Sequence, residues 1–163
     1  MSTAFPPDVA GDRRHDHEVC LTRTLAAAEQ VCGERGVRLT PQRRRVLEAI
    51  AAGHAAVGAY DIIDALAASG PRPAPISVYR ALDFLVANGL IHRIDSLSAF
   101  VLCASPGSSH RAQFLICQRC REIAEMRSDA VDAAIGEAAS AVGFAVSSAV
   151  VEVTGICRAC SRR

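Results

Sequence analysis

The residues with the clearest chemistry are two pairs of cysteines near the end of the chain. Cys117 and Cys120 form one CxxC motif, Cys157 and Cys160 form a second, and 36 residues separate the two motifs. Two residues between thiolates allow both sulfurs to reach one tetrahedral ion at about 2.3 Å. Four thiolates leave no open coordination position, so the motifs predict a structural zinc site. The alternative is that the cysteines are reduced and paired by chance.

A second group of possible metal ligands is spread over the middle of the chain. It consists of His92, Cys103, His110 and Glu125. Together these residues would supply two nitrogens, one sulfur and one oxygen to a tetrahedral ion. Taken singly, His92 is an ordinary strand histidine and Glu125 a surface carboxylate, and spacing alone leaves both interpretations open. The thiolate makes the set better suited to tetrahedral zinc than to octahedral iron(II) or manganese(II).

The N-terminal residues and the clustered cysteines indicate a cytoplasmic protein whose cysteines are reduced. The N-terminal residues lack the apolar segment of a signal peptide, and no run of eighteen apolar residues is long enough to span a membrane. In a reducing compartment, clustered cysteines bind metal more often than they form disulfides. Cys20 and Cys32 lie twelve residues apart on one predicted helix, and we interpret both as packing residues.

The elements that must position these ligands begin with four predicted helices and a hairpin. Apolar periodicity and turn residues place them at about 18–35, 41–53, 59–68 and 77–88, with strands at 90–94 and 99–102. Thr40 and Ser77 are the predicted N-caps of the second and fourth helices, and Gly89 is the predicted C-cap of the fourth. Helices followed by a hairpin are typical of a winged helix-turn-helix.

The second half of the chain has a different pattern. A strand at 113–116, a second around Ile123, a helix over 128–142 and a long strand over 144–153 predict a small α+β unit. Such a unit has little core of its own, and association through its sheet would remedy that. We therefore divide the chain, of α+β class, into a flexible tail (1–17), a winged-helix domain (18–103), a hinge (104–110) and a dimerisation and metal-binding domain (111–163).

The overall charge conceals a basic cluster. The net charge is +1, and all eighteen basic residues are arginine. Five of them fall between Arg35 and Arg45, a stretch without any acidic residue. The guanidinium group is always charged and binds phosphate in a bidentate manner, so the cluster favours nucleic-acid contact, with a solvated helix face as the alternative.

The fourth helix is the predicted recognition helix, because its N-terminal end would enter the major groove. Arg80 can bind guanine through two hydrogen bonds, and Tyr79 can pack on a thymine methyl group, although a core position for Tyr79 is the alternative. Candidates for phosphate contacts share polar side chains near helix starts: Thr40, Gln42, Arg43, Tyr60 and Ser77.

Over roughly residues 19–160 the chain resembles the ferric uptake regulator family. The resemblance is carried by VRLTPQRRRVLEAI (37–50), AYDIIDAL (59–66), SVYRALDFLVANGLIHRI (77–94), CASPGSSHRAQFLICQRC (103–120) and VTGICRAC (153–160). Within the family the chain is most similar to the zinc-sensing members. The His-rich run of iron-type members is reduced to Ser108-Ser109-His110, which leaves an iron or peroxide site short of ligands.

The resemblance implies a homodimeric, zinc-dependent repressor that binds palindromic operator DNA and controls zinc uptake genes. It implies two zinc ions per subunit, a regulatory ion on His92, Cys103, His110 and Glu125 and a structural ion on the four CxxC cysteines. It also supports a role of Tyr79 and Arg80 in reading bases. It implies neither a small-molecule substrate nor a membrane partner.

Two other classes of function are alternatives to this one. Within the family, the chain could sense iron, manganese or peroxide. Outside it, the CxxC pairs could belong to a redox-switched thiol protein or a zinc-ribbon enzyme. We expect no enzyme, because no nucleophile–base motif and no ligand set with an open zinc position are visible in the sequence.

Overall fold

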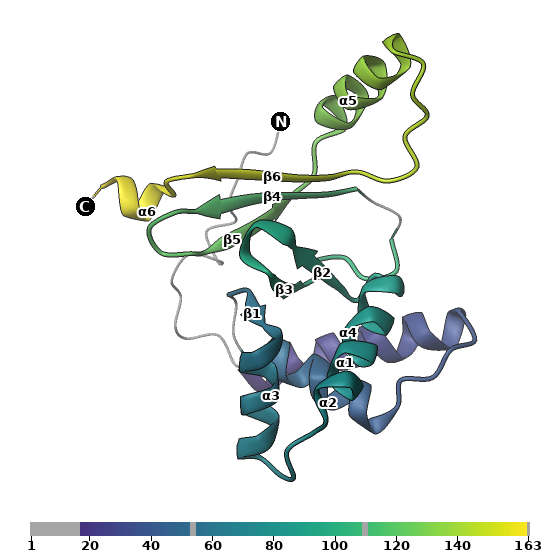
Figure 1. Cartoon of the computed structure of the whole chain (residues 1–163), viewed down its shortest axis with the longest axis vertical. Helices are drawn as coiled ribbons and strands as arrows, with labels where there is room; N and C mark the ends of the chain where they lie inside the picture. The colour runs from purple at the N-terminus through teal and green to yellow at the C-terminus, as the bar shows by residue number, and fades with distance from the viewer. Residues whose placement is uncertain (1–16, 53–54, 109–110, 163) are drawn as a thin grey trace.

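The computed structural model describes residues 17–52, 55–108 and 111–162, and the predicted tail (1–17) falls almost wholly outside these ranges. Four helices of the N-terminal half lie together at one side of the molecule (Figure 1): α1 (His17–Glu34), α2 (Pro41–Ala51), α3 (Ala59–Ala68) and α4 (Pro75–Ala87). The sheet of the C-terminal half lies at the opposite side, and a β-hairpin lies between the two (Figure 1). The predicted α+β class is confirmed.

The four helices enclose the larger of the two hydrophobic cores. Every helix contributes a buried stripe at the spacing of three and four residues that amphipathic helices show. Its fully buried members include Val46, Ile50, Ile62, Ile63, Val78, Leu82 and Leu85. Cys32 is buried in this core, which agrees with the packing role predicted for it, whereas Cys20 is half-buried and its packing role stays a prediction.

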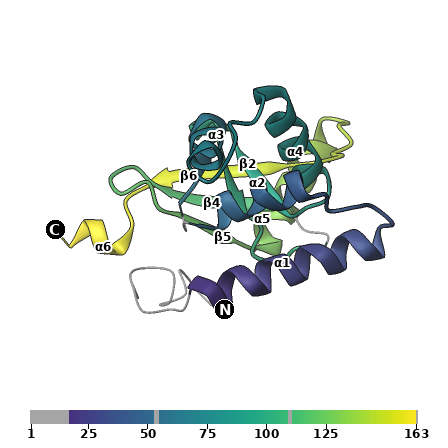
Figure 2. The ribbon, with the colours of Figure 1, turned by 90° about the horizontal axis from the view of Figure 1, so that it is seen from below.

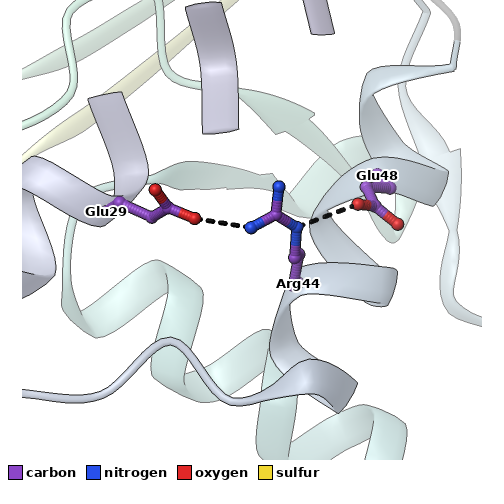
Figure 3. Close-up of polar contacts among 3 residues, drawn as sticks. All are labelled: Glu29, Arg44 and Glu48. Atoms are coloured by element: carbon purple, nitrogen blue, oxygen red, sulfur yellow. Dashed lines mark hydrogen bonds and ion pairs between the residues drawn. The ribbon is translucent and has the colours of Figure 1, made fainter. Parts of the chain in front are cut away.

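Helix α1 is joined to α2 by polar as well as apolar contacts. The Arg44 guanidinium donates hydrogen bonds to the carboxylates of Glu29 on α1 and Glu48 on α2 (Figure 3). All three side chains are partly exposed, and exposed ion pairs of this kind contribute about 1 kcal/mol or less. Helix α1 runs along one side of the molecule (Figure 2). Its buried apolar residues therefore contribute most to holding it in place.

The helix ends confirm two of the predicted caps and contradict a third. The Thr40 hydroxyl accepts the Arg43 N–H at 3.4 Å, and Gly89 has the left-handed φ of +65° that a C-cap glycine adopts. The N-cap assignment of Ser77 is wrong. Helix α4 begins two residues earlier, because Pro75 fits the first helical position, and the Ser77 hydroxyl instead donates to the Ala74 carbonyl at 2.7 Å.

The predicted hairpin forms and acquires a third strand. Strands β2 (Ile91–Ile94) and β3 (Ala99–Leu102) pair antiparallel, and a single 3₁₀ turn, η1 (Asp95–Leu97), joins them. We call residues 91–102 the wing. The short strand β1 (Val57–Gly58), which the sequence did not reveal, adds to β3 and attaches the wing to the start of α3.

The second sheet has the order β5-β4-β6. Strands β4 (Ala112–Cys117) and β5 (Ile123–Met126) form a hairpin, and β6 (Val150–Gly155) runs parallel to β4. Helix α5 (Asp129–Ala141) connects β5 to β6, and the short helix α6 (Arg158–Ser161) follows. The predicted strand over 144–153 is wrong in its first half: residues 144–149 form an irregular connection, because they have no neighbouring strand to pair with.

A smaller core joins the wing to this second sheet. Phe114, Ile116 and Ile123 of the sheet are buried against Ile94 of the wing, and the partly buried Leu97 and Val101 complete the contact.

Among the residues that the structure describes, no helix is long and apolar enough to cross a lipid bilayer.

The smaller core can be tested with two isoleucines that differ in burial. Ile94 is 0% exposed at the join, whereas Ile76 on α4 is 62% exposed. Ile94→Ala should lower the free energy of unfolding by about 2–5 kcal/mol, because it removes a packed side chain and leaves a cavity. Ile76→Ala should change it by less than about 0.5 kcal/mol. Urea unfolding of both variants measures the difference, and equal effects would contradict a packed core at the join.

Candidate metal centres and nucleic-acid interface

The four CxxC cysteines meet at one end of the second sheet. Cys117 is the last residue of β4, and Cys120 lies in the turn that leads to β5. Cys157 and Cys160 lie at the start and within α6, directly after β6. Because β4 and β6 are parallel neighbours, with Cys117 opposite Gly155, both motifs arrive at the same edge.

The distances between the sulfurs fit one tetrahedral ion. All four sulfur atoms lie within 4.8 Å of one another, and the Cys120 and Cys157 sulfurs are 3.7 Å apart. Zinc–sulfur bonds of about 2.3 Å at tetrahedral angles separate the sulfurs by about 3.8 Å. Arg119 also donates a hydrogen bond to the Cys160 carbonyl at 2.8 Å and so ties the two motifs together.

The backbone around the cysteines stabilises negative charge on sulfur. N–H groups of Cys157 and Cys120 donate to the Cys117 sulfur and lower the pKa of its thiol to about 6. The Glu122 N–H also lowers the pKa of Cys120, but the neighbouring thiols and burial outweigh it and raise that pKa to about 12. The backbone N–H groups therefore favour a thiolate at Cys117, and a divalent cation would favour the thiolate form of all four cysteines.

The second group of ligands meets where the wing contacts the second sheet. His92 lies on β2, Cys103 follows β3, and Glu125 lies on β5. One ligand atom from each lies within 4.8 Å of the others, and His92 Nε2 is 3.5 Å from Glu125 Oε1. Nitrogen and oxygen ligands of tetrahedral zinc, each at about 2.0 Å from the ion, are about 3.3 Å apart. The three donors thus fit a zinc ion.

The surroundings of these three residues are shielded from water. The side chains of His92 and Glu125 are only 15% and 8% exposed, and Cys103 is buried. The Phe114 ring packs edge-on against the His92 ring with centroids 5.3 Å apart, and the Ala104 N–H donates to Glu125 Oε2 at 2.9 Å. These contacts fix the direction of the imidazole and the carboxylate, as supporting residues do around metal ligands.

The pKa of His92 indicates the protonation state of this cluster when no metal is bound. Burial lowers its pKa, but hydrogen bonds and electrostatic attraction to Cys103 and Glu125 outweigh burial and raise the pKa to about 9. His92 is therefore protonated at neutral pH in the metal-free protein. Metal binding requires the neutral imidazole, so a metal ion that enters this cluster displaces a proton. The fourth predicted ligand, His110, lies outside the described residues.

The predicted base-reading residues lie on an open face of the helical half. Tyr79 and Arg80 are exposed on the first turns of α4, and Tyr60 is exposed at the start of α3. Tyr79 is thus not a residue of the helical core. Ile76, which we did not single out from the sequence, is exposed one turn before Arg80 and shares its face of the helix.

The other predicted phosphate contacts are partly engaged within the protein. The Arg43 guanidinium stacks 3.5 Å above the Phe84 ring and donates to the Arg38 carbonyl at 2.7 Å. The side-chain nitrogen of Gln42 is buried and makes no hydrogen bond with any residue that the structure describes. Thr40 and Ser77 bond to the backbone of their own helices, as described above.

Sequence reasoning also missed Glu152, a residue of β6 that contacts the wing. Its two carboxylate oxygens accept the N–H groups of Asp95 and Ser96 at 2.7 and 3.1 Å. A lone acidic residue in a predicted strand of valines was the only signal available, and it does not name its partner.

Comparison with known proteins places the chain in one protein family. The model of the ferric uptake regulator family matches residues 34–154. The zinc uptake regulation protein of Escherichia coli (strain K12) is 39% identical over 137 residues, which cover 83% of this chain and 80% of that protein. A zinc uptake regulator solved in complex with zinc and DNA superposes with a TM-score of 0.83 at 38% identity, over 87% of this chain and 95% of that one.

A further relative has been solved in two states. The holo form of XcZur, 40% identical, gives a TM-score of 0.80, whereas its apo form gives 0.53, each over 88% of this chain and 99% of that one. The structure described here is therefore more similar to the holo form of that relative than to its apo form. Matching motifs, matching fold and a family model that spans most of the sequence agree, and the chain belongs to the ferric uptake regulator family.

Proposed function

We propose that the protein is a zinc-responsive transcriptional repressor that binds palindromic operator DNA as a homodimer when its hinge zinc site is filled. The observation that carries this proposal is the buried cluster of His92, Cys103 and Glu125 at the join between the wing and the second sheet. The zinc uptake regulators to which the chain is similar, one of them solved with zinc and DNA, support the same function.

The cluster of His92, Cys103 and Glu125, which we call the hinge cluster, would act by linking the two halves of the protein. His92 belongs to the wing, Cys103 directly follows it, and Glu125 belongs to the second sheet, so an ion held by all three, with His110 as the fourth ligand, would fix one half against the other. To move an equilibrium from 1:99 to 99:1, a ligand must prefer the competent state by about 10⁴-fold, or about 5.5 kcal/mol. Structural zinc sites bind with about 10–16 kcal/mol, which is enough.

The donor set favours zinc over the metals of other members of the family. Cys103 contributes a buried sulfur, and thiolate with imidazole and carboxylate suits a tetrahedral zinc ion. Sensors of iron or manganese need more oxygen and nitrogen donors. The four-cysteine cluster has no open position and would hold a second, structural zinc ion.

Exposed apolar surface in the second half supports a homodimer. Helix α5 has no buried residue, and Val142 and Phe144, at and just beyond its end, are 80% and 65% exposed. Val150 and Val153 of the edge strand β6 are exposed as well. A second copy that covers these residues would remove their apolar surface from water. Residues 18–103 would then be the DNA-binding domain, 104–110 the hinge and 111–163 the dimerisation domain.

We place the protein in the cytoplasm and assign it no catalytic activity. Thiols are kept reduced in that compartment and are therefore available as zinc ligands. DNA contact would come from the exposed Tyr79 and Arg80 on α4, with Tyr60, Thr40, Gln42, Arg43 and Ser77 near the phosphates. The deciding experiment is operator binding measured with and without zinc, together with the metal content of the purified protein, where two zinc ions per subunit are expected.

Replacement of the hinge thiolate should uncouple DNA binding from zinc. Cys103→Ser removes the sulfur ligand, so we expect about one zinc per subunit instead of two and a roughly 100-fold loss of operator affinity at zinc levels that saturate the parent. Cys20→Ser, at a half-buried position outside both clusters, is the matched control. Zinc-dependent binding that survives in Cys103→Ser would contradict the proposed sensor site.

Replacement of a structural ligand should affect stability instead. Cys120→Ser leaves three thiolates at the edge of the second sheet, and the domain loses the binding energy of its ion. We expect a lower melting temperature, dissociation of the dimer at micromolar concentration, and loss of one zinc that is not restored by adding zinc. Calorimetry and analytical ultracentrifugation measure these effects. An unchanged dimer with full zinc content would argue against a structural role.

Replacement of the recognition arginine should reduce specificity. Arg80→Ala should cost about 1–3 kcal/mol on the operator and relax selection at one base pair, with little effect on random DNA. Arg158→Ala on α6, remote from the helical half, controls for the loss of one positive charge. Equal losses on operator and random DNA would assign Arg80 to phosphate contact instead of base reading.

A further inference from the structure

Three neighbouring residues of the second sheet point at the wing from one row. Phe114 on β4 is paired with Glu125 on β5 and with Glu152 on β6. Directly paired residues of neighbouring strands project from the same face of a sheet. Glu125 and Phe114 contact His92, and Glu152 contacts the turn between the two wing strands. The wing, which lies directly beside this sheet in Figure 1, is thus held at both of its ends.

The contact of Glu152 is a double hydrogen bond to the protein backbone. Its Oε1 accepts the Asp95 N–H at 2.7 Å and its Oε2 accepts the Ser96 N–H at 3.1 Å, across 57 and 56 residues of sequence. Burial raises the pKa of Glu152, but the bonds from Ser96 and Asp95 outweigh burial and lower it, so the carboxylate is ionised at neutral pH. Hydrogen bonds to an ionised acceptor are roughly twice as strong as those between neutral groups.

Among the described residues, no basic side chain forms an ion pair with this carboxylate. Arg93 on β2 forms its ion pair with the Asp95 side chain at 2.8 Å, whereas the Asp95 backbone N–H donates to Glu152. Glu152 is not part of either cluster of possible metal ligands. Its contact with the wing therefore needs no metal, although it joins the same two parts of the protein as the hinge cluster.

We propose that Glu152 is a positioning residue that holds the wing turn against the second sheet without metal and so sets the zinc concentration at which the two halves lock together. This rests on the proposed function, because it takes the hinge cluster as a zinc site. An ion that bridges the wing and the sheet binds the closed arrangement. Its apparent affinity for the protein equals its affinity for the closed arrangement multiplied by the fraction of molecules that are closed. Any contact that raises this fraction therefore raises the apparent zinc affinity by the same factor.

The test is a comparison of Glu152→Gln with Glu137→Gln, a control that removes a carboxylate from the exposed surface of α5. Loss of the charge and of one acceptor should shift the zinc midpoint of the hinge site, titrated against a competing chelator, about tenfold to higher zinc. Operator affinity at saturating zinc should stay within about twofold, because excess zinc restores closure. The control should match the parent.

Hydrogen exchange in the metal-free protein gives an independent measurement. The Asp95 and Ser96 amides should exchange faster in Glu152→Gln than in the parent, while amides in the helical core are unchanged. An unchanged zinc midpoint and unchanged exchange, with zinc-dependent operator binding intact, would overturn the role of Glu152 alone. If operator binding in the parent does not depend on zinc, the proposed function fails, and the exchange comparison still tests the contact.

Removal of the donor tests the same bond from the other side. Asp95→Pro deletes the N–H that Glu152 accepts, and Ile94 before it has the extended backbone (φ −102°, ψ 103°) that precedes proline readily. Asp95→Ala keeps this N–H and loses only the ion pair with Arg93. We expect a shift in zinc midpoint for Asp95→Pro and none for Asp95→Ala. The Asp95→Pro and Glu152→Gln shifts should not add in the double variant; full additivity would show that the two groups act separately.

Discussion

The structure depends on the burial of the second sheet against the wing. Phe114, Ile116 and Ile123 are buried in a cluster to which Ile94, Leu97 and Val101 of the wing contribute. On its other side the sheet has helix α5, which buries no residue of its own. The two halves therefore share one apolar interface, and the arrangement of every group at the hinge follows from it.

This interface gives the two cysteine-containing clusters different physical roles. The four-cysteine cluster is made entirely by the ends of β4 and β6 and the segments that follow them, so an ion there stabilises a single sheet. The cluster of His92, Cys103 and Glu125 draws its ligands from both sides of the interface. In the function that we propose, an ion in the second cluster would favour the arrangement in which the wing and the sheet are joined, whereas an ion in the first would stabilise the sheet alone, and this difference would separate a regulatory site from a structural one.

The arginine cluster shows that position in the sequence alone does not decide whether an arginine is available to bind DNA, because contacts within the protein also matter. Arg44 forms ion pairs with Glu29 and Glu48, Arg43 stacks on Phe84, and Arg45 donates a hydrogen bond to the Leu66 carbonyl, so three of the five cluster arginines contribute to the packing of the helices. Arg80, outside the cluster, stands exposed on α4. The surface that we expect to face DNA is consequently formed by the starts of α3 and α4, and the net charge of +1 says little about it.

The sequence by itself determined the local features: the four helices, the hairpin, the α+β class and the two CxxC pairs. Periodicity, proline, glycine and cysteine spacing act over a few residues, so they can be read without a partner. The tertiary structure decided what depends on distant pairing. Strand β1 forms because β3 lies beside it, residues 144–149 lack a partner, and Ser77 lies inside a helix that Pro75 begins. His92, Cys103 and Glu125 become a site, and Glu152 reaches the wing, only because strands far apart in sequence meet, and side-chain spacing along the chain does not encode that register.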